Sequence, residues 1–160
     1  MLDAITRKGV DKIIAITDSM FVTGDEDLAE FKIGGKTGCV SEDKNYLYVK
    51  EKPKALFGSN LSMDKAFENL LNWFSKDIEG IWNRIHSAKE LNEAVILASK
   101  LCSGNAAALL GINNETGTIE IGKKADLLIG NITKKENYKF ELNEVVLRGK
   151  MPNLTRKAAN

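Results

Sequence analysis

The stretch that decides the fold of this chain is Asp11-Lys-Ile-Ile-Ala-Ile-Thr-Asp18, an apolar run that ends abruptly on a carboxylate. Residues 13–16 predict a short strand buried on both faces, as in a parallel sheet. Thr17 and Asp18 then stand at its carboxyl end, where α/β sheets and barrels collect their catalytic residues. A buried carboxylate is costly unless paired, yet an Asp here can also simply close a turn. The stretch alone leaves both interpretations of Asp18 open.

The composition of the 160 residues is that of a globular protein, with 43% hydrophobic and 28% charged residues and a net charge of +1. Such a small net charge gives no strong attraction to nucleic acid or to an anionic membrane. No apolar run approaches the ~20 residues of a membrane span, and the start of the chain lacks a signal-peptide pattern. Cys39 and Cys102 have no metal-like spacing and are typical of a reduced pair. We therefore expect a soluble, cytoplasmic protein without nucleic-acid or membrane partners.

The sequence contains a single histidine, His86. Catalytic zinc and related metal sites draw on several His or carboxylate ligands. Apolar spacing over 76–85 predicts a short helix, and His86 would stand at its end, where the helix carbonyls favour a cation. We therefore interpret His86 as a helix-end residue and predict no metal site in this chain alone.

The pattern along the chain opens as the end of a helix, residues 1–8, followed by a stop at Gly9 and then by the buried strand. No other parallel strand of this kind follows, so this strand needs neighbours that the chain does not supply. Between Phe31 and Lys52 short strands alternate with turn signals, of which Gly34-Gly35 is the clearest. This segment predicts an antiparallel hairpin or small meander.

The remaining patterns predict helices and then strands. Ser87 is a candidate helix cap with Glu90 at the capping-box position, and Gly111 is a candidate helix stop. Alternation with period two favours strands in the last third of the chain. Helices are expected at 62–75, 87–100 and 105–110, and strands of a small β-sheet at 117–122, 125–130 and 144–149.

Three blocks of the sequence resemble the amidohydrolase superfamily. The first ends in Ile-Thr-Asp-Ser-Met20 and resembles the last barrel strand with its catalytic Asp. The second joins Phe31-Lys-Ile-Gly-Gly-Lys-Thr37 to Ala55-Leu-Phe-Gly-Ser-Asn-Leu-Ser-Met63, and resembles the Gly-Gly hairpin and Leu-x-Gly-Ser-x-Leu-Thr-Met segment of the N-acetylglucosamine-6-phosphate deacetylase family. The third, at 93–131, is specific for the superfamily only. The resemblance covers nearly the whole chain, but only the C-terminal portion of the family's enzymes.

The fold that this resemblance implies is an α/β fold: a C-terminal fragment of a (β/α)₈ TIM barrel, with the last strand and its covering helices, plus strands of a small β-sandwich. The barrel part would occupy 1–114 and carry an inserted β-hairpin at about 28–52. The β-sandwich strands would occupy 115–150, and 151–160 would form a flexible tail. Residues 76–85 resemble an insertion, to which we assign no role.

The resemblance also implies a reaction, the metal-dependent hydrolysis of N-acetylglucosamine 6-phosphate to glucosamine 6-phosphate and acetate. Asp18 matches the catalytic residue that moves the proton between the attacking water and the leaving amine. Leu56, Phe57 and Gly58 match the loop that contacts the sugar phosphate. The family's divalent metal, zinc or iron, would be held by residues outside this chain, so we expect the chain alone to be inactive and to bind no metal.

Partners follow from the same resemblance: the amino-sugar phosphate, a missing N-terminal barrel segment and further copies of the chain in a homo-oligomer. Two alternatives stay open. In the first, the chain is a non-catalytic binding or assembly module derived from an amidohydrolase. In the second, it is part of a different amidohydrolase, such as a deaminase or a dihydroorotase-like enzyme.

Overall fold

The structure, a computed structural model, describes residues 2–25, 27–79 and 85–152. The chain divides into two compact units, residues 15–66 and residues 1–14 with 67–160. The first consists mainly of antiparallel sheet, and the second combines helices with antiparallel strand pairs. Within the described residues no helix combines the length and the apolar character that crossing a membrane requires.

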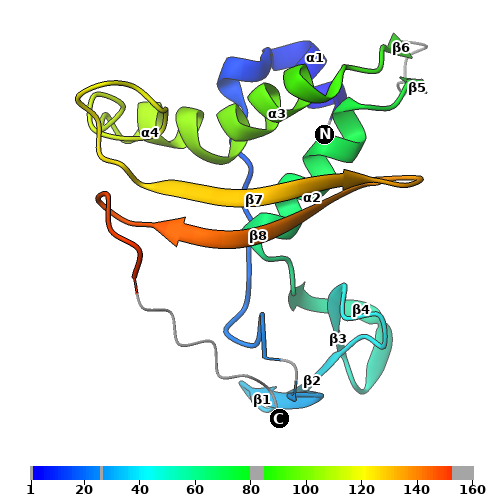
Figure 1. Ribbon diagram of the computed structural model, residues 1–160. Coiled ribbons are helices and arrows are strands. Elements are labelled where there is room, and N and C mark those ends of the chain that lie inside the picture. The colour runs from blue at the N-terminus through cyan, green and yellow to red at the C-terminus, as the bar shows by residue number, and fades with distance from the viewer. Residues whose placement is uncertain (1, 26, 80–84, 153–160) are drawn as a thin grey trace. The chain divides into compact units, whose positions relative to one another are not determined.

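The unit at 15–66 is built on a four-stranded antiparallel sheet (Figure 1). The turn between its first two strands holds Gly34 and Gly35 at φ 56° and 76°, as a type I′ turn requires, and pairs Ile33 with Lys36 across the strands. The meander expected over 31–52 is therefore confirmed, and a fourth strand extends it. In chain order the strands are β1 (Glu30–Ile33), β2 (Lys36–Val40), β3 (Tyr46–Val49) and β4 (Lys52–Ser59).

A small aromatic core holds this sheet together. Val22, Phe31 and Leu47 are buried in it. The ring of Phe31 meets that of Phe57 edge to face, with 5.0 Å between centroids, which is a favoured arrangement of two aromatic rings. The partly buried residues that complete the core are Met20, Leu28, Val40 and Phe57.

The strand expected at 13–16 is absent, and that prediction was wrong. These residues belong to no helix or strand, and the side chain of Ile16 is 71% exposed. A strand buried on both faces needs a strand on either side, and no described residue pairs with this segment. The TIM-barrel part of the expected fold rested on this strand and is not confirmed; the fold observed is mixed α/β with antiparallel sheets.

The other unit gathers most of the helices. Helix α3 (Leu91–Ser99) runs through a π-helical turn, η2 (Lys100–Gly104), into α4 (Asn105–Leu109). The buried side chain of Asn105 donates from Nδ2 to the carbonyls of Val10 (2.8 Å) and Ile13 (2.6 Å). These bonds tie α4 to the segment that follows α1 (Leu2–Lys8) and the 3₁₀ turn η1 (Val10–Lys12).

A long hairpin, β7 (Leu127–Lys134) with β8 (Tyr138–Val146), lies beside α2 (Met63–Phe74) in this unit (Figure 1). The side chain of Asn72 accepts from the N–H of Tyr138 and donates to its carbonyl, both at 2.8 Å. A carboxylate oxygen of Glu68 accepts from the N–H of Phe140 at 2.8 Å. Two side chains of α2 thus make hydrogen bonds with the outward backbone groups of Tyr138 and Phe140, as a neighbouring strand would do.

The helix expected at 87–100 begins only at Leu91, so the cap expected at Ser87 was wrong. The N–H of Ala88 donates to Asp77 (2.9 Å) and that of Lys89 to the carbonyl of Phe74 (2.8 Å). These bonds hold the stretch extended before the helix starts. The helix expected at 105–110 is confirmed as α4, with Gly111 at φ 70° after it.

Other sequence-based expectations changed in the same unit. Residues 117–122 form no strand, because no described segment pairs with them, and Ile121 lies wholly in solvent. The last strand is β8, which starts earlier than the expected 144–149 and ends at Val146. The helix expected at 76–85 is replaced in its described part by a strand pair, β5 (Ile78–Glu79) with β6 (Ile85–His86); its residues 80–84, like the tail from 153, lie outside the described residues.

Candidate functional site

Asp18 stands on an exposed turn with a left-handed backbone, at φ 52°. Aspartate is one of the few non-glycine residues that tolerate this conformation. The N–H of the next residue, Ser19, donates to Oγ1 of Thr17 at 3.3 Å. The local chemistry is thus that of a polar turn, and it presents the Asp18 side chain to solvent.

The segment after Asp18 lies alongside the end of β4. Ser19 and Ser59 form a parallel bridge, and the N–H of Met20 donates to the carbonyl of Ser59 at 3.1 Å. The hydroxyl of Ser19 donates to the carbonyl of Leu61. The structure therefore places the segment that follows Asp18 beside the end of β4, which is forty positions away in the sequence.

The Met20 side chain fills the space beside Gly58. A Cβ atom at position 58 would lie 2.3 Å from Sδ and 2.8 Å from Cγ of Met20. Any side chain here would have to push the Met20 side chain aside. The glycine therefore lets β4 and the 18–20 segment lie close together.

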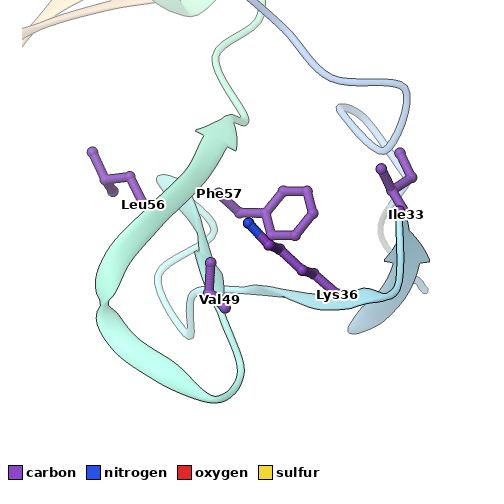
Figure 2. Close-up of a pocket in the computed structure, with 6 residues that line it drawn as sticks. Ile33, Lys36, Val49, Leu56 and Phe57 are labelled. Carbon is purple, nitrogen blue, oxygen red and sulfur yellow. The ribbon is translucent and has the colours of Figure 1, made fainter.

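Leu56 and Phe57, the other expected substrate contacts, point to different surroundings. Leu56 is 73% exposed, whereas Phe57 is half-buried against Phe31. Successive residues of a strand face opposite sides of the sheet, and Figure 2 shows the two side chains directed away from each other. The side chain of Phe57 thus anchors β4 in the aromatic core.

A hollow of about 330 Å³ opens beside this part of β4 (Figure 2). Its walls come from all four strands of the sheet and the first turn, and are apolar except for one lysine: Ile33, Gly34, Lys36, Val49, Leu56 and Phe57.

A second hollow of about 370 Å³ lies at the turn between β2 and β3 and is lined by Ser41, Glu42, Asp43 and Tyr46. The Ser41 hydroxyl donates to Asp43 at 2.7 Å, and the backbone and side chain of Asn45 donate to the same carboxylate. These bonds hold the pKa of Asp43 below its usual value, with the Ser41 hydroxyl as the largest cause. The cluster closes its own turn, and we assign it no ligand.

The divalent metal implied by the amidohydrolase resemblance does not fit the residues described. Across 2–25, 27–79 and 85–152, no group of three or more His, Cys, Asp or Glu side chains is arranged to hold a metal ion. His86 lies in β6, not at a helix end as expected, with Nε2 3.3 Å from the carbonyl of Phe74. Burial raises the pKa of the Cys102 thiol to about 11, so its reactive thiolate is scarce at neutral pH.

Comparison with known structures finds eight matching chains. The fold is similar to that of N-acetylglucosamine-6-phosphate deacetylase from Pasteurella multocida, with a TM-score of 0.59 and 21% identity over 88% of this chain. The match spans 30% of the length of that enzyme. No protein-family model matches the chain, and no curated protein sequence does. At the level of the fold, the likeness confirms the resemblance to a portion of such a deacetylase.

Proposed function

We propose that this chain is the C-terminal part of a metal-dependent amidohydrolase that converts N-acetylglucosamine 6-phosphate into glucosamine 6-phosphate and acetate. The observation that carries the proposal is the parallel bridge between Ser19 and Ser59, which sets the segment after Asp18 alongside the end of β4. The two sequence blocks that resemble a deacetylase thereby meet at one place in the fold. The likeness to a deacetylase structure supports the same function.

In this proposal Asp18 moves the proton. A water molecule attacks the acetamide carbonyl, and the Asp18 carboxylate accepts the proton that the water loses. The C–N bond then breaks, acetate leaves, and the same proton passes from Asp18 to the departing amine. A base used in this way needs hydrogen-bond reach to the water, and the exposed left-handed turn directs the carboxylate away from the sheet core.

The backbone of Leu56, Phe57 and Gly58 would hold the sugar beside this carboxylate. The described residues provide no group of side chains that could hold a metal ion. We propose that an N-terminal barrel segment supplies the metal site. We propose accordingly that the chain alone is inactive and works with that segment in a homo-oligomer.

The first test follows backbone amide NMR signals of this chain during titration with N-acetylglucosamine 6-phosphate. We expect shifts at Ser19 and Gly58, and smaller shifts with glucose 6-phosphate, which lacks the acetamido group. Equal responses to the two sugars, or none at Ser19 and Gly58, would contradict a site for an amino sugar. Acetate release by the isolated chain, with stoichiometric metal and turnover typical of an intact deacetylase, would overturn the proposed inactivity.

Asp18→Asn tests the proton role in the complete enzyme that the proposal requires. The amide keeps the size of the side chain but is no longer a base, so we expect deacetylation to fall by about 10²–10⁴-fold, while bound metal, measured by elemental analysis, stays unchanged. Asp27→Asn, an exposed carboxylate of the same unit, is the control and is expected to keep full activity. An Asp18→Asn enzyme with near-normal turnover would refute the role.

A further inference from the structure

The side chain of Asn105 holds the backbone just before the segment that carries Asp18. Asn105 is 8% exposed, and its Nδ2 atom donates to the carbonyls of Val10 at 2.8 Å and Ile13 at 2.6 Å. A side-chain amide nitrogen has two N–H donors, and here each of them has a carbonyl partner. One buried group therefore fixes the chain at two points, and the second lies a few residues before Asp18.

The π-helical turn η2 places a second residue on the same side as Asn105. The backbone N–H of Asn105 donates to the carbonyl of Lys100, which is the i→i+5 bond of a π-helix, so these two residues stand one turn apart. An α-helix needs only about 3.6 residues for a turn and would rotate them onto different sides. The ammonium group of Lys100 pairs with the carboxylate of Asp11. The π turn thus lets a buried amide and a surface ammonium hold the same short segment, 10–13.

A second anchor follows directly after Asp18. Ser19 forms a bridge with Ser59, and its hydroxyl donates to the carbonyl of Leu61. In the part of the chain that the structure describes, residues 14–18 pair with no strand. The backbone of this short segment is therefore held from its two ends, and not by a sheet around it.

We propose that Asn105 is a positioning residue for Asp18 in deacetylation; this inference rests on the proposed function. Asn105 acts through the backbone, because both of its N–H donors are bonded to carbonyls of the chain. A catalytic base has to lie within hydrogen-bond reach of the water, and a displacement of about 1 Å lowers the rate on the order of 10²-fold. Loss of the bond to Ile13 would release the segment at one end and spread the Asp18 carboxylate over more positions.

The first measurement uses this chain and compares the wild type, Asn105→Leu and Ser103→Ala by backbone amide NMR relaxation. Leucine keeps the size of the Asn105 side chain but donates no hydrogen bond. We expect the order parameters of 14–18 to fall from about 0.85 towards 0.6 in Asn105→Leu, while those of α3 stay unchanged and confirm that the unit is folded. Ser103→Ala, at an exposed position of the same π turn, is the control and should change neither.

The wild-type chain tests the same proposal without any substitution, which decides the matter where Asn105→Leu does not fold. We expect the side-chain amide protons of Asn105 to exchange slowly with solvent, because they are buried and bonded, and 14–18 to be nearly as ordered as α3. Order parameters below about 0.6 at 14–18 in the wild type would overturn the proposal whatever the variants do.

The second measurement uses the complete enzyme that the proposed function requires. Asn105→Leu should lower kcat about tenfold and leave KM within about twofold, since it disturbs the position of the base and not the binding of the sugar. Ser103→Ala should change neither. Adding Asn105→Leu to Asp18→Asn should cause no further loss, because a residue that acts through Asp18 then has no base left to position. An equal loss with and without the Asp18 carboxylate would show a merely structural role and overturn the proposal.

The outcomes separate this proposal from the proposed function. If Asp18→Asn abolishes deacetylation while Asn105→Leu changes neither kcat nor the order parameters of 14–18, the positioning role is overturned and the function stands. If Asp18→Asn keeps near-normal turnover, the proposed function falls, and with it any catalytic role for Asn105. If Asn105→Leu loosens 14–18 and lowers kcat only where the Asp18 carboxylate is present, both stand.

Discussion

Two glycines of the sheet unit, Gly58 and Gly38, leave no room for a Cβ atom, but the side chains that fill the space differ in how easily they can move. A Cβ at Gly58 would meet the thioether of Met20, and a Cβ at Gly38 would meet the ring of Phe31 at 2.3 Å. A methionine side chain is flexible and can move, whereas the ring of Phe31 is fixed between those of Phe21 and Phe57. The same added methyl group should therefore have different costs at the two positions.

We expect Gly38→Ala to lower the free energy of unfolding by about 3 kcal/mol and Gly58→Ala by about 1 kcal/mol, within the range for overpacked sites. Urea denaturation followed by tyrosine and tryptophan fluorescence measures both. Gly58→Ala combined with Met20→Ala should recover much of the loss, because the second change removes the clashing atoms. A larger loss for Gly58→Ala than for Gly38→Ala would show that Met20 is held rigidly.

At Asp18 the sequence predicted the wrong local structure. The apolar run before it predicted a barrel strand, yet the structure shows an exposed left-handed turn. The bridge to Ser59 could not be predicted, because it joins segments forty residues apart that share no periodic pattern.

Helix α2 stabilises the β7–β8 hairpin, because its side chains form hydrogen bonds with the backbone of β8. Asn72 makes two such hydrogen bonds, to the N–H and the carbonyl of Tyr138. We expect Asn72→Ala to lower the free energy of unfolding by about 2 kcal/mol, because both partly buried groups lose their partner. Thermal unfolding followed by circular dichroism measures it.

Asn69→Ala is the matched control on the same helix. Asn69 is exposed, and alanine is the better helix former, so this variant should unfold within about 0.5 kcal/mol of the wild type. Equal losses in the two variants would mean that the bonds to Tyr138 do not stabilise the hairpin.

The elements that sequence reasoning placed well are those with strong local signals. The Gly34-Gly35 turn fixes its hairpin by backbone conformation alone, and the apolar spacing of α2 needs no distant partner to be recognised. The failures depend on distant groups. Asp77 and Phe74 hold 88–89 out of a helix, and residues 117–122 alternate like a strand but have no partner among the described segments.

For the whole molecule, exposed apolar side chains predict association. Ile119 is 86% exposed, Leu109 77% and Leu110 70%, and large exposed apolar groups promote contact between chains. We expect light scattering after size exclusion to show a mass that rises with protein concentration. Ile119→Ser with Ile121→Ser should lower that rise, whereas Lys139→Ser, a change of an exposed charge, should not. A monomer at all concentrations would contradict this prediction.

The two edges of the β7–β8 hairpin are not equivalent. At Tyr138 and Phe140, side chains of α2 already hold the outward N–H groups of β8, so an incoming strand would find no free donors there. Any strand that extends this sheet beside these residues has to add to β7 instead. Helix α2 thus makes the two edges of the hairpin different. In a larger assembly, it would determine that a further strand pairs with β7 and not with β8 beside these residues.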